Sequence, residues 1–316
     1  MTSSPHALFS QEPVLKLLRS AQGAFPIQSD PWQDLATGLW VEREQVLRWV
    51  EELHRAGVIS GVRLEPDPAH PEVQEWWMPA GEEPLPTGLM PRWLFVSETG
   101  MRLRSVAQLK TFRPSPEYRE YAWPASEWLK CGTFLEPAPD DGSTLREPTT
   151  ERSYFVQQES YARSVPLLEE QAALLEALSQ PVLPELSEPF WKGIGSRIGL
   201  PTLTVAREET SRVLLSKRTR RFHLVVQPGA VGYPVTALVA WALPLESAAP
   251  ASHALRIWKA AADVVIRQPT QKYPYTLSAV LLGRSPEDLN TTLQTLELKW
   301  KRPIDWVLKG TLHYAQ

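Results

Sequence analysis

Cysteine is almost absent from the sequence, since Cys131 is the single example among 316 residues. One cysteine excludes an intrachain disulfide and a zinc site built on several cysteines. The histidines outside the motifs discussed below show no metal-ligand spacing either: His6, His54, His70, His253 and His313. The sequence therefore predicts no metal site.

Long hydrophobic runs are also absent. The longest, "VGYPVTALVAWALPL", contains prolines and is shorter than the roughly 20 apolar residues that a membrane-spanning helix needs. The first residues, "MTSSPHALFSQEP", lack the basic segment and apolar core of a secretory signal. We therefore expect a cytoplasmic protein with no membrane partner.

The sequence has no excess of positive charge, and its net charge is −3. A DNA-binding protein usually carries such an excess, because neutralising phosphates supplies much of its affinity. Of the two segments that could act as recognition helices, residues 41–56 hold four glutamates against three arginines. The other, residues 205–221, holds six basic residues against two glutamates. DNA is not expected as a partner of such a mismatched pair.

Glycine is scarce relative to proline, with 16 against 30 residues, which indicates rigid, irregular connections. Tryptophan is abundant, with 13 residues. These side chains are either large core residues or aromatic walls for a flat ligand. The composition alone leaves both readings open.

The chain repeats itself at an offset of 158 residues. Pro26, Pro31 and Trp32 in "FPIQSDPWQDLATGLW" correspond to Pro184, Pro189 and Phe190 in "LPELSEPFWKGIGSRIGL". Helical periodicity precedes and follows each motif, and a short extended segment ends each unit. This order is typical of a winged helix-turn-helix, so we predict two such units, copy one and copy two.

Copy two continues with the order strand, helix, strand, strand, helix, which is typical of a ferredoxin-like unit. The sequence predicts an α+β fold of tandem winged helix-turn-helix and ferredoxin-like units, with copy one diverged. The predicted domains are a first winged helix (1–63), a diverged α+β region with linker (64–160), a second winged helix (161–227), a ferredoxin-like domain (228–300) and a C-terminal extension (301–316).

Two stretches of copy two, "RRFHLVVQPGAVGYPVTALVAWALP" and "VVIRQPTQKYPYTLSAVLLGRS", resemble the sirohaem decarboxylases, relatives of the Lrp/AsnC regulators. The resemblance covers residues 12–63 and 167–300. It implies removal of acetate carboxylates from sirohaem in haem d1 or related tetrapyrrole biosynthesis. It also implies a tetrapyrrole ligand, no cofactor beyond this substrate, and a homo-oligomer or a paralogous partner subunit.

The resemblance also assigns roles to residues of copy two. A flat, polyanionic ring calls for guanidinium forks on its carboxylates and aromatic side chains on its faces. The predicted catalytic residues are His223 and Tyr275. Carboxylate binding is predicted for Arg220, Arg221, Arg267 and Lys272, and ring packing for Tyr233 and Tyr273. The alternatives are a hydrogen-bonded strand histidine, solvated basic residues and tyrosines of the core.

Departures from the family pattern keep a second function open. The family usually carries a basic pair with a histidine in the turn where this chain has Gln227 and Pro228. Thr276 stands where an asparagine is usual. The alternative is a non-catalytic tetrapyrrole-binding subunit, or an Lrp/AsnC-like regulator.

Overall fold

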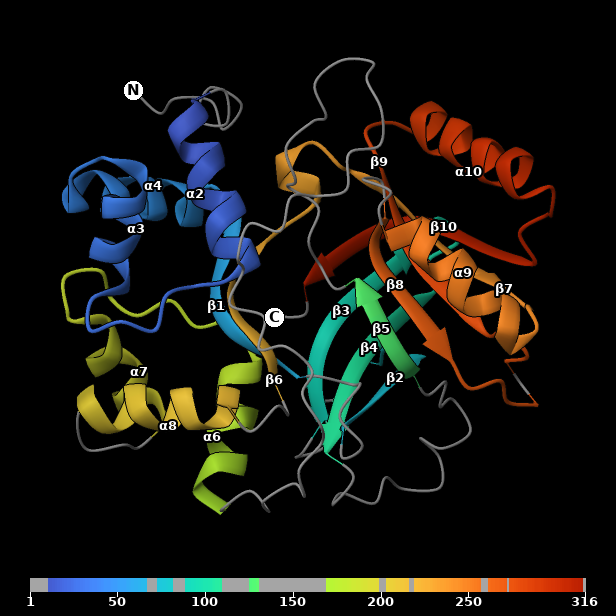
Figure 1. Ribbon diagram of the computed structural model, residues 1–316. Coiled ribbons are helices and arrows are strands. Elements are labelled where there is room, and N and C mark those ends of the chain that lie inside the picture. The colour runs from blue at the N-terminus through green and yellow to red at the C-terminus, as the bar shows by residue number, and fades with distance from the viewer. Residues whose placement is uncertain are drawn as a thin grey trace.

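The computed structural model describes residues 11–66, 73–81, 89–109, 125–130, 169–198, 203–215, 219–256, 261–271 and 273–314. These residues form a helical half and a sheet half, which lie side by side (Figure 1). The carboxyl end of the chain lies between the two halves in the same view. Each half contains elements from both copies.

The helical half holds the two predicted helix-turn-helix units. Copy one supplies α2 (Glu12–Gly23), α3 (Pro31–Leu39) and α4 (Arg43–Arg55), and copy two supplies α6 (Glu169–Ser179), α7 (Phe190–Ile198) and α8 (Leu203–Leu215). The repeated proline motif marks a helix start. Asp30 caps α3 by accepting hydrogen bonds from the backbone N–H groups of Trp32 and Gln33, and Pro31 occupies the first helical position.

One strand from each copy forms a two-stranded antiparallel sheet, β1 (Ile59–Pro66) with β6 (Thr219–Val226). The extended segment that ends each winged helix thus pairs with the corresponding segment of the other copy. Gly61 allows the close packing of this ribbon, since its φ is 131° and an added Cβ would lie 2.6 Å from the backbone of Val182. Val62 and Val182 exchange two backbone hydrogen bonds at this point.

An aromatic cluster joins the two helix-turn-helix units. The ring of Phe25 contacts Trp32, Phe190 and Phe222 at centroid distances of 4.9, 5.3 and 5.5 Å. The Trp191 indole nitrogen donates a hydrogen bond to the backbone carbonyl of Gln28, at 2.6 Å. The residues of the repeated motif therefore form one shared core.

The sheet half is one eight-stranded sheet with the order β2-β4-β3-β10-β7-β9-β8-β5. Copy one supplies β2 (Val73–Pro79), β3 (Leu89–Ser97), β4 (Arg102–Leu109) and β5 (Ala125–Lys130). Copy two supplies β7 (Val235–Trp241), β8 (Ala261–Arg267), β9 (Leu277–Gly283) and β10 (Trp306–Tyr314). The short turn η1 (Gly229–Val231) leads from β6 to β7.

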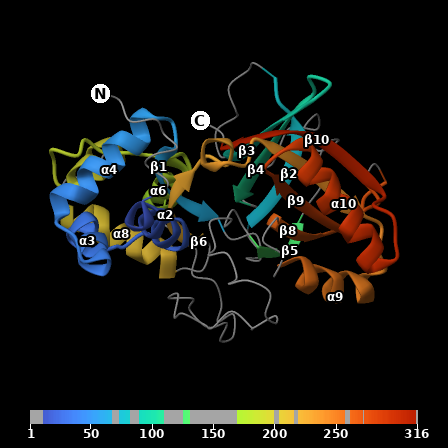
Figure 2. The ribbon, with the colours of Figure 1, turned by 90° about the horizontal axis from the view of Figure 1, so that it is seen from above.

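The copy-two strands form the predicted ferredoxin-like unit, with the order β10-β7-β9-β8. Its helices α9 (Leu245–Arg256) and α10 (Pro286–Trp300) cover the sheet face turned away from the helical half (Figures 1 and 2). A hydrophobic cluster that includes Val239, Leu281 and Leu293 lies beneath them. The opposite sheet face is left to pack against copy one.

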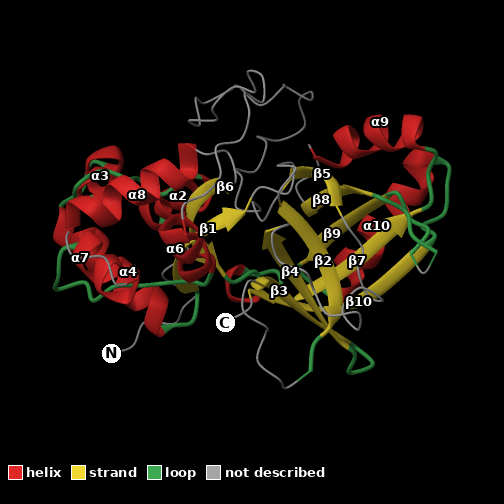
Figure 3. Ribbon diagram, turned by 90° about the horizontal axis from the view of Figure 1, so that it is seen from below, coloured by secondary structure: helices red, strands yellow, loops and turns green. Residues whose placement is uncertain are grey.

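Copy one repeats this strand arrangement, since the order β2-β4-β3 corresponds to β7-β9-β8. The pairs β3–β10 and β5–β8 join the copies, and β2 contacts β5, so the sheet curves back on itself (Figure 3). The predicted α+β fold of two winged helix and ferredoxin-like units is confirmed, with a diverged first copy.

The segment 301–316, assigned from sequence to an extension, contains β10 in the middle of the sheet. Position 310 of this strand requires glycine, because a Cβ there would clash with the Val96 carbonyl on β3. The domain boundaries themselves remain predictions. Across the described ranges, no helix combines the length and apolarity needed to cross a bilayer.

Candidate functional site

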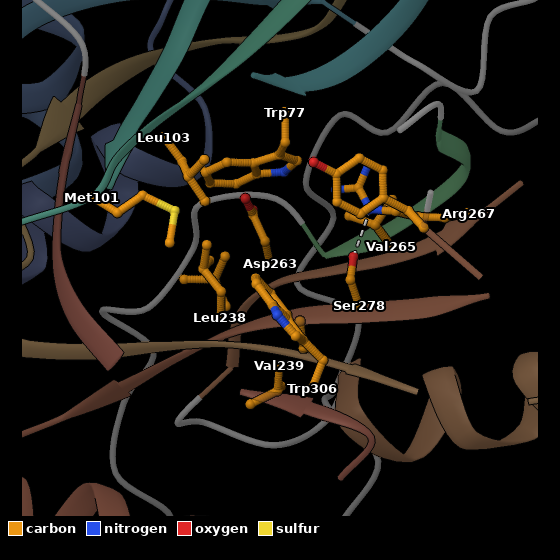
Figure 4. Close-up of a pocket in the computed structure, with 13 residues that line it drawn as sticks. Trp77, Met101, Leu103, Leu238, Val239, Asp263, Val265, Arg267, Ser278 and Trp306 are labelled. Carbon is orange, nitrogen blue, oxygen red and sulfur yellow. Dashed lines mark hydrogen bonds between the residues drawn. The ribbon is translucent and has the colours of Figure 1, made fainter. Parts of the chain in front are cut away.

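A pocket of about 230 Å³ lies between strands of copy one and strands of copy two (Figure 4). Copy one contributes Trp77 from β2, Leu103 from β4 and the adjoining Met101. Copy two contributes residues of β7, β8 and β9 together with Trp306 at the start of β10. Trp77 and Trp306 lie on opposite sides of the pocket in the close-up. The lining is mainly apolar, and two indoles form part of its walls.

Two charged side chains line the pocket from one strand. Asp263, Val265 and Arg267 alternate along β8, so all three lie on the same sheet face. Asp263 is 3% exposed and Arg267 is 2% exposed. The Arg267 Nε donates a hydrogen bond to the hydroxyl of Ser278, at 2.7 Å. The strand thus presents a fixed cation and a fixed acid to a mainly apolar cavity.

Buried residues of copy one that do not line the pocket contact both of these charged side chains. Glu75 on β2 places Oε2 2.8 Å from Nη1 of Arg267. Its other oxygen accepts hydrogen bonds from Arg92 Nη1, at 3.1 Å, and from the Ser105 hydroxyl, at 2.6 Å. Arg92 Nη2 also lies 3.6 Å from Asp263. The four residues Arg267, Glu75, Arg92 and Asp263 form a chain of alternating charges whose two ends line the pocket.

The charge chain continues into the β1–β6 ribbon. Arg92 Nε also contacts Glu65, which forms a second ion pair with Arg63. Arg63 stands opposite His223 in the register of the two strands, and Glu65 stands opposite Arg221. One face of the ribbon therefore carries four polar residues, while Phe222 and Leu224 on the other face belong to the hydrophobic core.

The buried glutamates are held in their charged form. Burial alone would raise the pKa of Glu75, but the guanidiniums of Arg267 and Arg92 outweigh it and hold that pKa below its usual value. Burial also opposes ionisation of Glu65, yet Arg63 and Arg92 hold its pKa well below the usual range. Both carboxylates are therefore ionised near neutral pH.

His223 lies in this ribbon and outside the lining of the pocket. It is 0% exposed, and its Nε2 lies 3.1 Å from Glu65 and 3.3 Å from Arg63. Burial, with the nearby charge of Arg221, lowers the pKa of His223 to about 3, although Glu65 opposes the shift. The imidazole is therefore neutral, and the tautomer decides whether Nε2 donates to Glu65 or accepts from Arg63.

The four predicted carboxylate-binding residues have different positions. Arg267 lines the pocket. Arg221 is buried in the helical half, where its Nη1 donates to the backbone carbonyl of Gln22, at 2.8 Å. The side chain of Arg220 and the whole of Lys272 lie outside the described residues. Among the four, the structure thus places Arg267 at the cavity.

The three predicted tyrosines also differ. Tyr273 lines the pocket. Tyr275 packs against Trp306, with ring centroids 6.3 Å apart and planes inclined by 30°, and so supports the pocket wall from outside the lining. Tyr233 is partly buried against the hydrophobic core. Gln227, in the turn where the family carries basic residues, donates a hydrogen bond to Ser60 at 2.8 Å.

Several residues of the site were missed by the sequence analysis. Asp263 was detectable as a lone acid in the apolar strand "AADVVIR", at an alternating position relative to Arg267. Glu75 and Trp77 lie in copy one, whose order of elements is not legible in the sequence, and Trp306 lies in the segment assigned to an extension. No local signal connects these three residues to β8, because they meet it through the pairing of the two copies.

The arrangement suits a flat, largely apolar ligand that carries carboxylates. The indoles can pack on an aromatic ring, and Arg267 can form hydrogen bonds with a carboxylate. Among the described residues, no three His, Cys, Asp or Glu side chains gather as a metal site would require.

Comparisons with known proteins found one matching family model and similar solved structures. Residues 15–59 match the family model described as the siroheme decarboxylase NirDL-like HTH domain. The crystal structure of the siroheme decarboxylase NirDL is similar at a TM-score of 0.57 and 15% identity, over 95% of this chain and 91% of that one. Its complex with an iron-uroporphyrin III analogue is similar at 0.55 and 14%, over 96% and 91%.

At such identities the structural likeness establishes the fold, over nearly the full length of both chains. No curated protein matches the sequence. The resemblance to the sirohaem decarboxylases that the sequence predicts is confirmed by the matched helix-turn-helix domain and by the shared fold.

Proposed function

Because the chain carries a siroheme decarboxylase NirDL-like HTH domain and shares the NirDL fold, we propose that it binds sirohaem, or a related acidic iron tetrapyrrole, and removes acetate carboxylates from it. The observation that carries the proposal is the pocket between the copies, where Trp77 and Trp306 face a cavity that also contains Arg267. The proposal is supported by the NirDL crystal that holds an iron-uroporphyrin III analogue.

The pocket residues account for ligand binding in two ways. Trp77 and Trp306 pack against the faces of the macrocycle, because indoles stack well on extended aromatic rings. Arg267 donates hydrogen bonds to one carboxylate of the ligand, since the guanidinium matches carboxylate geometry. The apolar remainder of the lining excludes water from that carboxylate.

Decarboxylation at this site breaks the bond between the acetate methylene carbon and the carboxylate carbon. Carbon dioxide leaves, the electron pair stays on the methylene carbon and spreads into the ring, and a proton then converts this carbon to a methyl group. We assign the donation of this proton to the phenol of Tyr273, which lines the pocket. The proton is regained from solvent, so the reaction needs no oxidant or reductant.

A second candidate is a tetrapyrrole-binding subunit without catalytic activity. Its support is the position of His223, which is buried and neutral in the β1–β6 ribbon and does not line the pocket. The described part of the lining contains no histidine that could replace it as an acid or iron ligand. In this case the chain would bind sirohaem and leave it unchanged.

Anaerobic titration of the protein with sirohaem separates these candidates. The proposal predicts a shift of the Soret band, followed by release of carbon dioxide and a matching loss of mass from the tetrapyrrole. A spectral shift without loss of mass would select the binding subunit. Absence of both would overturn the proposal, and salt-sensitive retention of a promoter fragment would select a regulator instead.

A further inference from the structure

We propose that Glu75 of copy one is a positioning residue that weakens the hold of Arg267 on the substrate carboxylate, so that carbon dioxide can leave. The inference rests on the proposed function and assigns a task to a residue that does not line the pocket. It also explains why a buried anion lies beside a guanidinium that is expected to bind an anionic ligand.

The geometry gives Glu75 direct access to this guanidinium. Its Oε2 lies 2.8 Å from Nη1 of Arg267, while Arg92 and Ser105 fix its other oxygen. On the neighbouring strand β9, the Ser278 hydroxyl accepts a hydrogen bond from Nε of Arg267 and so fixes its orientation. Both partners are almost completely buried, with side-chain exposures of 1% for Glu75 and 2% for Arg267. Their interaction is therefore weakly screened by solvent.

Buried ion pairs link Arg267 to the other charged residues of this network. Three arginines, Arg63, Arg92 and Arg267, alternate with the three carboxylates of Glu65, Glu75 and Asp263. A substrate carboxylate at Arg267 thus meets a cation that already has a buried carboxylate beside it. Without Glu75, the same guanidinium would lose this buried counter-charge.

This balance matters because the reacting carboxylate loses its charge as carbon dioxide departs. A strong ion pair with Arg267 would stabilise the bound substrate more than the transition state, which lowers KM and slows turnover. Sharing Arg267 between Glu75 and the substrate keeps its orientation and reduces that ground-state stabilisation. Glu75 therefore favours kcat at the expense of affinity.

The substitution Glu75→Gln tests this role, since it removes the charge and keeps the shape. We expect sirohaem to bind about tenfold more tightly and kcat to fall about tenfold, a split that a purely structural role would not produce. Glu51→Gln is the matched control, because it makes the same change at an exposed residue of α4 that pairs with Arg55 and does not line the pocket. It should change both constants by less than about threefold.

A folded Glu75→Gln protein that binds sirohaem more weakly, or turns it over at the wild-type rate, would overturn this inference alone. If that variant fails to fold, Glu75→Asp replaces it. Because the aspartate side chain is one methylene shorter, its carboxylate should interact less strongly with Arg267. Affinity and kcat should then shift in the same directions as in Glu75→Gln, by smaller factors. Shifts in the opposite directions would overturn the inference. Wild-type protein that does not bind sirohaem would overturn the proposed function together with it.

Discussion

The Glu75 carboxylate on β2 lies 2.8 Å from the Arg267 guanidinium on β8, so the two copies of the repeat meet in one buried ion pair. Both residues face the interior of the curved sheet, and Arg267 continues into the pocket. The first copy has therefore diverged in sequence while remaining part of the site. Among the described residues, copy one contributes part of the pocket wall and the charged side chains that contact Arg267 and Asp263.

Arg267→Gln should abolish most of the affinity for sirohaem. The amide cannot form the charged, two-pronged contact with a carboxylate, and Glu75 would be left with one cationic neighbour fewer. We expect at least a hundredfold loss, about 3 kcal/mol, in an anaerobic absorbance titration. Arg284→Gln, an exposed arginine at the start of α10, is the control and should bind as wild type does. Equal affinities in the two variants would remove Arg267 from the site.

Trp77→Ala and Trp306→Ala should each weaken sirohaem binding, because each removes one indole from the pocket wall. A loss of about tenfold per substitution corresponds to stacking of about 1.4 kcal/mol. Trp40→Ala serves as the control, since that indole is 95% exposed at the end of α3. Quenching of tryptophan fluorescence by sirohaem should decrease for the two pocket variants and remain for the control. Unchanged quenching and affinity in the pocket variants would place the ligand elsewhere.

Much of the fold could be predicted from sequence because its signals are local. The Asp30-Pro31 start of α3 and the Ser285 cap of α10 are short motifs with a known physical basis. The order of elements in copy two was legible for the same reason. The pairing of β1 with β6 was not, since a strand does not encode which other strand completes it.

The site was predictable only in part. Arg267 and Tyr273 were named from the family resemblance, and both line the pocket. Arg221 and His223 were named as well, yet the alternation that places them on one face of β6 does not show what covers that face. In the structure, Arg63 and Glu65 of copy one lie beside these two residues on the same face. Arg92 of β3 contacts Glu65 there, and Arg221 donates to the Gln22 carbonyl of α2.

The buried Glu65 should stabilise the protein far more than an exposed glutamate with a similar partner. Glu65→Gln leaves Arg63 and Arg92 without their shared carboxylate in the interior, which should cost about 3–5 kcal/mol of unfolding free energy. Glu51→Gln is the matched control, because Glu51 pairs with Arg55 at the surface of α4, and it should cost less than about 0.5 kcal/mol. Urea titrations measure both values. Similar costs would show that the buried network does not support the fold.

Lowering the pH from about 6.5 to 5 should destabilise the protein through His223. In the unfolded chain this residue takes up a proton as the pH falls through about 6.5, whereas the folded chain resists protonation until about 3. Stability from this group should therefore fall by about 1.4 kcal/mol per pH unit across that window. The lowered pKa values of Glu65 and Glu75 place their losses below their unfolded pKa, near 4.5. In His223→Gln the slope between pH 6.5 and 5 should be shallower, and an identical slope would contradict this assignment.

Mass spectrometry of the tetrapyrrole recovered after anaerobic incubation of sirohaem with the whole chain tests the central claim most directly. The account predicts products that have lost one or more carboxylates as carbon dioxide with wild-type protein and with Arg284→Gln, and unchanged sirohaem with Arg267→Gln. Unchanged sirohaem with the wild-type protein would contradict decarboxylation. Equal product from the wild type and Arg267→Gln would contradict the assignment of the reaction to this pocket.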